Sequence, residues 1–230
     1  TPLEMANEFQ KWNTEELDSF LIEITRDILK YKDDKGFLLE RIRDSAGQKG
    51  TGKWTAIAAL QYGVPVTLIG EAVFARCLSA LKSERVNASS VLKGPATKPS
   101  VEDLSKFLGH IKHALYCAKI VSYAQGFMLM REAAKDNNWN LNYGGIALMW
   151  RGGCIIRSVF LGNITHAYTR NPQLSNLLLD GFFKKAIETG QESWRKVVAN
   201  AVVWGIPVPA LSAALSFYDG YRTAALPANL

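Results

Sequence analysis

The feature that most constrains the fold of this chain is a long stretch of apolar residues at helical spacing near its middle. Ser100-Val101-Glu102-Asp103 has the composition of a helix start. After it, apolar side chains recur every three or four residues, at Leu104, Phe107, Leu108, Ile111, Leu115, Ala118 and Val121, and on to Phe127. This spacing predicts a helix of more than about thirty residues, which at about 1.5 Å per residue is long enough to cross a whole domain.

Helical signals also occupy the rest of the chain. Thr1-Pro2-Leu3-Glu4 predicts a helix start with a capping box, and Asn13-Thr14-Glu15-Glu16 predicts another, followed by apolar residues at helical spacing. That helix is expected to end before a turn at Asp33-Asp34-Lys35-Gly36. The polar, proline-containing stretch from Lys82 to Ser100 predicts a surface loop. Because no clear alternation of apolar and polar residues is evident, the sequence predicts an all-α fold.

One segment resembles a membrane span, since Val197 to Tyr218 contains no charged residue. Pro207 and Pro209 lie in the middle of it, where they would break the helix that a bilayer requires. We therefore expect two buried helices joined by a tight turn and no membrane segment. The amino terminus also lacks the features of a signal peptide.

Charge and cysteine content narrow the function classes. The net charge is +6, but the 27 basic residues are interspersed with 21 acidic ones, so we expect a small anionic ligand and no nucleic acid. Cys77, Cys117 and Cys154 are odd in number and far apart, which predicts reduced core residues in a cytoplasmic protein. The three histidines have no metal-binding spacing, so no metal site is expected.

Two pairs of short segments recur at an interval of about 140 residues. Phe20 to Thr25 resembles Phe160 to Thr165, and Gly63-Val64-Pro65-Val66 resembles Gly205-Ile206-Pro207-Val208. The order is kept, which predicts a duplicated helical unit, although short apolar matches also arise by chance. In each Gly-x-Pro-Val element, the glycine is expected to end one helix in the left-handed conformation and the proline to start the next.

The segment most suggestive of chemistry is Asp44 to Thr55, in which three glycines are interleaved with two lysines and a threonine. It leads into an apolar helix expected near Trp54, so its amides, hydroxyl and ammonium groups could converge on a phosphate. A nucleoside-triphosphate loop is one alternative, but Trp54 stands where that loop needs Ser or Thr, and no strand is expected upstream. A glycine-rich corner that merely links two helices is the other.

Three stretches carry a resemblance to a known family. They are Asp44 to Thr55, Tyr62 to Cys77, and Leu141 to Ser158, and they resemble the signatures of the 6-phosphogluconate dehydrogenases. The resemblance extends over essentially the whole chain. It implies NADP-dependent oxidative decarboxylation of 6-phosphogluconate to ribulose 5-phosphate by a homodimer in the cytoplasmic pentose phosphate pathway.

The same resemblance implies three binding residues. Lys49, Thr51 and Arg76 match the positions that hold the substrate phosphate in this family. An ammonium, a hydroxyl and a bidentate guanidinium suit a phosphate dianion. For Lys53 we expect only a solvent-exposed side chain.

The departures from the family pattern matter equally. The resemblance implies that the dinucleotide-binding Rossmann domain, the catalytic lysine and the catalytic glutamate lie upstream of Thr1, and that a tail completing the partner's site lies beyond Leu230. We therefore expect residues 1–230 to be the helical C-terminal domain of such an enzyme, with no catalytic residue, cofactor-binding residue or metal ligand assignable in this numbering. Two hypotheses remain: part of an active dehydrogenase, or an inert helical interaction and dimerisation module.

Overall fold

The long central helix is present in the computed structural model, which describes residues 1–229. It is α6, Leu104–Asp136, with 33 residues. The helix begins later than expected, because Asp103, and not Ser100, caps it by accepting a hydrogen bond from the amide of Lys106 at 2.9 Å. The prediction of a helix longer than thirty residues is confirmed.

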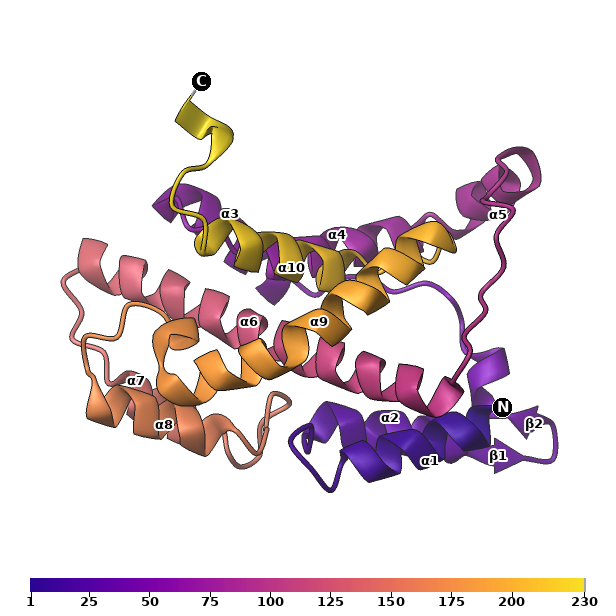
Figure 1. Ribbon diagram of the computed structural model, residues 1–230, viewed down its shortest axis with the longest axis horizontal. Helices are drawn as coiled ribbons and strands as arrows, with labels where there is room; N and C mark the ends of the chain where they lie inside the picture. The colour runs from indigo at the N-terminus through magenta and orange to yellow at the C-terminus, as the bar shows by residue number, and fades with distance from the viewer. Residues whose placement is uncertain (230) are drawn as a thin grey trace. The chain divides into compact units, whose positions relative to one another are not determined.

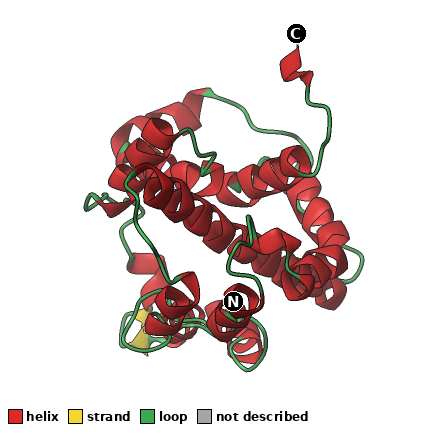
Figure 2. Cartoon of the chain, turned by 90° about the vertical axis from the view of Figure 1, so that its left-hand side faces the viewer, coloured by secondary structure: helices red, strands yellow, loops and turns green. Residues whose placement is uncertain are grey.

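The all-α prediction is also confirmed, since the ten α-helices and three 3₁₀ turns of the described residues together contain 67% of the chain. In this part of the chain the only strands are β1 (Lys32–Asp33) and β2 (Gly36–Phe37), which form a short antiparallel hairpin at the expected turn (Figure 2). Asp33 pairs with Gly36, whose φ of 101° suits a residue without a side chain.

The chain forms two compact units, each made from two separate segments. The first unit contains residues 1–43 and 141–175, and the second contains the remainder. In the first unit, four α-helices pack in pairs, α1 on α2 and α7 on α8, with a short 3₁₀ turn after the hairpin (Figure 1). Their bounds are α1 Pro2–Trp12, α2 Phe20–Lys30, η1 Leu38–Arg41, α7 Tyr143–Met149 and α8 Leu161–Arg170.

The two segments of the first unit are joined next to α2. Ser19 and Ser158 form an antiparallel bridge, and the amide of Phe20 donates to the carbonyl of Arg157 at 3.2 Å. The Arg157 guanidinium also pairs with Glu23 at 2.5 Å. These contacts fix the start of α2 to the segment before α8.

The second unit is built around α6. Its other α-helices are α3 Thr51–Tyr62, α4 Thr67–Ala80, α5 Lys82–Val91, α9 Gly181–Val203 and α10 Pro209–Tyr221, with 3₁₀ turns at η2 Leu177–Leu179 and η3 Pro227–Asn229. Helix α9 packs along α6, and α10 packs on α4 (Figure 1). Gly190 permits the close approach of α9, since a Cβ there would lie 2.5 Å from the Cys117 sulfur. Burial raises the pKa of the Cys117 thiol to about 12.

Both Gly-x-Pro-Val elements end a helix as expected. Gly63 after α3 and Gly205 after α9 have φ values of 65° and 66°, in the left-handed region. In each case the amide after the glycine donates to the carbonyl five residues earlier at 2.8 Å. The expected role of Pro65 and Pro207 is wrong, because α4 begins at Thr67 and α10 begins at a different proline, Pro209.

The residue before α4 is Val66, whose apolar side chain cannot cap the helix. The cap comes instead from a side chain of α6. The side-chain oxygen of Gln125, which is 0% exposed, accepts from the amide of Leu68 at 3.1 Å. Its amide nitrogen donates to the hydroxyl of Thr67 at 3.1 Å. A buried side chain of the central helix therefore replaces the usual N-cap of α4.

Two local expectations are wrong. The start at Asn13 does not form, because the Asn13 side chain accepts from the Ser19 amide at 3.2 Å and Ser19 caps α2. The segment expected to be a loop from Lys82 contains α5 instead.

The three cysteines are free, but only Cys117 is fully buried, and Cys77 is exposed.

Candidate functional site

The glycine-rich segment consists of an irregular loop followed by the first turn of a helix. Residues 44–50, named the glycine-rich loop from here on, form no helix or strand, and α3 begins directly after them at Thr51. Gly50 is the residue before the helix and has φ 118°, which residues with side chains rarely adopt. This conformation turns the chain from the loop into α3.

Two of the three glycines are required by what surrounds them. A Cβ on Gly52 would lie 2.8 Å from Cγ2 of Val73, so the absent side chain lets α3 approach α4. A Cβ on Gly50 would lie 3.2 Å from the Trp54 ring. Gly47 differs, since a Cβ there would meet nothing within 4 Å. The structure uses Gly47 through its carbonyl oxygen.

The start of α3 is open. Gly50 has no side chain to cap it, no other side chain within residues 1–229 takes that role, and the first turn contains no acidic residue. The first amides of an α-helix have no partner within the helix and carry its positive dipole end. The side chains of Lys49 and Thr51 flank this point and are exposed. An open helix start beside an ammonium and a hydroxyl is suited to binding an anion.

Arg76 extends from α4 to the same loop. Its Nε donates to the carbonyl oxygen of Gly47 at 2.8 Å, and its Nη2 donates to the same oxygen. Within residues 1–229 no hydrogen bond of Nη1 is present. The structure therefore connects Arg76 to the loop that contains Lys49, two residues after Gly47.

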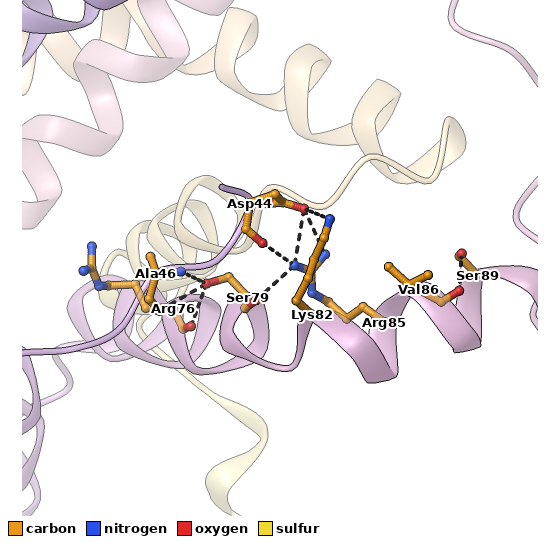
Figure 3. A network of polar contacts seen from close by, with 8 residues as sticks. All are labelled: Asp44, Ala46, Arg76, Ser79, Lys82, Arg85, Val86 and Ser89. Atoms are coloured by element: carbon orange, nitrogen blue, oxygen red, sulfur yellow. Dashed lines mark hydrogen bonds and ion pairs between the residues drawn. The ribbon is translucent and has the colours of Figure 1, made fainter. Parts of the chain in front are cut away.

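Sequence reasoning missed three residues that hold the loop, the first of which is Ser79. Its hydroxyl oxygen accepts from the amide of Ala46 at 2.9 Å (Figure 3). The same hydroxyl donates to the carbonyl of Arg76, one turn earlier on α4, at 2.8 Å. Ser79 thus binds the loop one residue before the position that Arg76 binds.

Lys82 and Arg85 hold the beginning of the loop. Lys82 Nζ lies 3.1 Å from Oδ2 of Asp44, and Arg85 Nη1 lies 3.2 Å from the same oxygen. Arg85 Nη2 also donates to the Asp44 carbonyl at 2.8 Å and to the Ser79 carbonyl at 3.0 Å. The hydrogen bond from Lys82, followed by that from Arg85, holds the pKa of the Asp44 carboxyl below its ordinary value.

These contacts form one set, named the loop network, whose members are Asp44, Ala46, Gly47, Arg76, Ser79, Lys82 and Arg85. The four helical members recur at every third position. Only Leu81 separates α4 from α5, so this polar stripe runs through both helices. The spacing was a usable signal, but it lay partly in a segment expected to be a loop.

Two other interpretations of the glycine-rich segment, a nucleoside-triphosphate loop and a corner that only links helices, fit the structure less well. A nucleoside-triphosphate loop needs a strand before it, and residues 38–50 contain none. A purely structural corner explains the contacts of Gly50 and Gly52 but gives no reason for an open helix start with exposed Lys49 and Thr51.

Other candidate groups add no second site. Within residues 1–229, no three His, Cys, Asp or Glu side chains lie where they could jointly hold a metal ion. His110 Nδ1 is hydrogen-bonded to the Ser193 hydroxyl at 2.8 Å. None of the described helices combines the length and apolar character that a membrane span requires.

Comparison with known proteins gives consistent matches over the whole chain. The family described as "6-phosphogluconate dehydrogenase, C-terminal domain" matches residues 1–230. The chain is 85% identical over 227 residues to the decarboxylating 6-phosphogluconate dehydrogenase of Ceratitis capitata, covering 99% of the chain and 47% of that relative. The enzyme of the same name from Homo sapiens is 66% identical over 228 residues, with the same two coverages.

A solved structure is also similar. It is that of Plasmodium falciparum 6-phosphogluconate dehydrogenase, described in its apo form and in complexes with its cofactor NADP+ and its substrate 6-phosphogluconate. The TM-score is 0.94 at 42% sequence identity, over 99% of this chain and 50% of that one. The chain thus spans about half the length of the relatives that it matches.

Proposed function

Because the chain belongs to the 6-phosphogluconate dehydrogenase C-terminal domain family, we propose that it works as part of an NADP-dependent oxidoreductase. The reaction is the oxidative decarboxylation of 6-phosphogluconate to ribulose 5-phosphate in the cytoplasmic pentose phosphate pathway. The named activity of the relatives supports this proposal, as do the cofactor and substrate of the Plasmodium falciparum protein.

In this proposal the glycine-rich loop and α3 bind the phosphate of the substrate. Lys49 supplies an ammonium, Thr51 a hydroxyl, Arg76 the Nη1 side of its guanidinium, and α3 its first amides. The main support for this assignment is the open start of α3 beside Lys49. Arg76 is linked to the same loop by its hydrogen bond to the Gly47 carbonyl. Such a site combines charge-assisted hydrogen bonds with the positive end of a helix.

The phosphate is remote from the carbon that is oxidised, so its role is to position the substrate. The acid, the base and most of the NADP site then belong to the part of the relatives that this chain does not span. We accordingly expect residues 1–230 alone to produce no reduced cofactor from 6-phosphogluconate and NADP. Turnover by the purified chain would contradict this division of roles.

We also infer that the helices form a duplicated unit of four, with α1 to α4 corresponding to α7 to α10. The matching glycine caps after α3 and α9 support this inference. The threonine hydroxyls of α2 and α8 also lie alike: Thr25 donates to the Leu21 carbonyl, and Thr165 lies 3.2 Å from the Leu161 carbonyl and 3.0 Å from that of Gly144.

The second role we propose for the chain is dimerisation, as the body of a homodimer. Large apolar side chains on neighbouring helices of the second unit support it. Leu60 of α3 is 84% exposed, and Phe74 of α4 is 65% exposed. Apolar surface of this kind is typical of an interface between proteins.

Substitution in a full-length enzyme containing this chain tests the phosphate assignment. We expect Lys49→Ala or Arg76→Ala to remove a charge-assisted interaction of about 1.5–3 kcal/mol, which raises the KM for 6-phosphogluconate about ten- to hundredfold. The KM for NADP should scarcely change. Lys53→Ala, which removes an exposed lysine of the same segment, is the matched control.

A second substrate isolates the cause. Unphosphorylated gluconate lacks the group that Lys49 and Arg76 are proposed to bind, so its already poor use should hardly respond to either substitution. If the two substitutions weakened the use of gluconate and 6-phosphogluconate equally, the phosphate assignment would have to be abandoned.

A further inference from the structure

The loop network is ordered in a regular way. Going down α4 and α5, Arg76 binds Gly47, Ser79 binds Ala46, and Lys82 and Arg85 bind Asp44. Figure 3 shows these residues with the exception of Gly47. Helix and loop thus run in opposite directions, and later helical side chains engage earlier loop residues, with Lys82 and Arg85 sharing Asp44. The contacts use the loop backbone at three positions, so they fix the path of the chain itself.

Arg85 has a double role in this arrangement. One of its nitrogens, Nη2, donates both to the Asp44 carbonyl and to the Ser79 carbonyl near the end of α4. The Ser79 carbonyl lies in the last turn of α4, where carbonyls lack partners within the helix. Arg85 therefore fixes the start of α5 to the end of α4 and, from that junction, holds the beginning of the loop.

We propose that Ser79, Lys82 and Arg85 are positioning residues for the anion site, which set the place of Lys49 and Thr51 without touching the substrate. This inference rests on the proposed function of Lys49, Thr51 and Arg76. The glycine-rich loop has no helix or strand of its own. Its shape therefore depends on contacts that come from outside the loop.

The physical basis is preorganisation. A binding group contributes fully only when its position does not have to be ordered at the moment of binding. Packing does not restrain Gly47, because a Cβ there would meet nothing within 4 Å, and Arg76 holds it only through its carbonyl oxygen. Without the bonds to Ala46 and Asp44, this part of the loop would sample many conformations, and Lys49 two residues later would move with it.

The experiment compares two serines, one in α4 and one in α5, in a full-length enzyme containing this chain. Ser79 and Ser89 each donate a hydroxyl to the carbonyl three residues earlier, at 2.8 and 2.7 Å (Figure 3). Only Ser79 also binds the loop. Ser79→Ala should raise the KM for 6-phosphogluconate about three- to tenfold, whereas Ser89→Ala, the matched control, should leave it unchanged.

Two further readouts separate positioning from a general loss of structure. The KM for NADP should stay within about twofold of its original value in Ser79→Ala, and Ser79→Thr, which keeps the hydroxyl, should restore the KM for 6-phosphogluconate. Arg85→Gln should act in the same direction as Ser79→Ala, because it removes the charge that holds Asp44. Equal increases in both Michaelis constants, or no rescue by threonine, would overturn the positioning role.

Hydrogen exchange distinguishes this inference from the proposed function. The Ala46 amide loses its acceptor in Ser79→Ala, so its exchange in the substrate-free enzyme should accelerate about tenfold or more. If exchange accelerates and Lys49→Ala raises the KM for 6-phosphogluconate, but Ser79→Ala does not, the positioning inference alone is wrong. If neither substitution changes that KM, the phosphate assignment fails, and the inference fails with it.

Discussion

Helices α3 and α9, whose terminal glycines match in the proposed duplication, begin in opposite ways. At α9 the carboxylate of Asp180 caps the helix and accepts from the amide of Phe182 at 3.0 Å. At α3 the residue before the helix is Gly50, which offers no side chain. A helix start that contains its own carboxylate is already occupied by an anion, whereas an open one can accept an anion from solution. The difference supports the proposal that the start of α3, and not that of α9, binds the phosphate.

The start of α4 extends the comparison and gives the largest expected effect. Gln125→Ala removes the buried side chain that caps α4 and leaves the Leu68 amide without a partner. We expect a loss of about 3 kcal/mol in the free energy of unfolding, measured by urea denaturation of the full-length enzyme. Gln125→Met, which keeps the size of the side chain but not the acceptor, should lose a comparable amount; a much smaller loss would show that the cap is not the cause.

The glycines before and within α3 give the next effect. Gly52→Ala forces a Cβ against Val73, and Gly50→Ala places a side chain at φ 118°, so each should cost about 1–3 kcal/mol of stability. Gly47→Ala is the matched control and should change stability by less than about 0.5 kcal/mol. Urea unfolding of the three variants is the measurement, and an equal cost at Gly47 would contradict this account of the loop.

A crossed pair of substitutions then tests the contrast between the two helix starts directly. Asp180→Ala removes a cap and should cost about 1 kcal/mol of stability, without changing the KM for 6-phosphogluconate. Thr51→Ala removes an exposed hydroxyl that caps nothing, so it should raise that KM with little change in stability. If both variants shifted stability and KM alike, the two helix starts would not differ in the way proposed here.

The smallest effect concerns pH. Because the pKa of the Asp44 carboxyl is lowered in the folded state, its contacts with Lys82 and Arg85 are fully formed above its ordinary pKa of about 3.9. They are lost as the pH falls through the lowered value. Exchange of the loop amides, corrected for intrinsic rates, should therefore stay constant down to about pH 4 and accelerate below it. Asp44→Asn should not show this acceleration of exchange. Acceleration that begins at about pH 6 would mean that a titratable group other than Asp44 is responsible.

The sequence predicts those helices whose stabilising contacts lie between residues close together in the chain. Helix α6 was predictable because its apolar spacing and its cap at Asp103 are local. Helix α5 was not, since it is polar and none of its residues is buried. It is held in part by the bonds from Lys82 and Arg85 to Asp44, about forty residues earlier. Contacts at such separation leave no mark in a local pattern.

The candidate site divides in the same way. Resemblance to a family pointed to Lys49, Thr51 and Arg76, and the glycine-rich composition pointed to an anion at a helix start. Neither indicated Ser79, because a serine near the end of a helix is common and its partner, the Ala46 amide, belongs to the backbone. The false start at Asn13 failed for a related reason, since its side chain bonds the Ser19 amide instead of capping a helix.

The loop network also has a consequence for the order in which the molecule matures. Its bonds join residues 29 to 41 positions apart, and the most distant of them involves Arg85. Closing such long segments is entropically slow compared with forming a single helix. During synthesis, the bonds that hold Asp44 cannot form until Lys82 and Arg85 of α5 have left the ribosome. We therefore expect α3 and α4 to form first and the affinity for phosphate to arise late in folding.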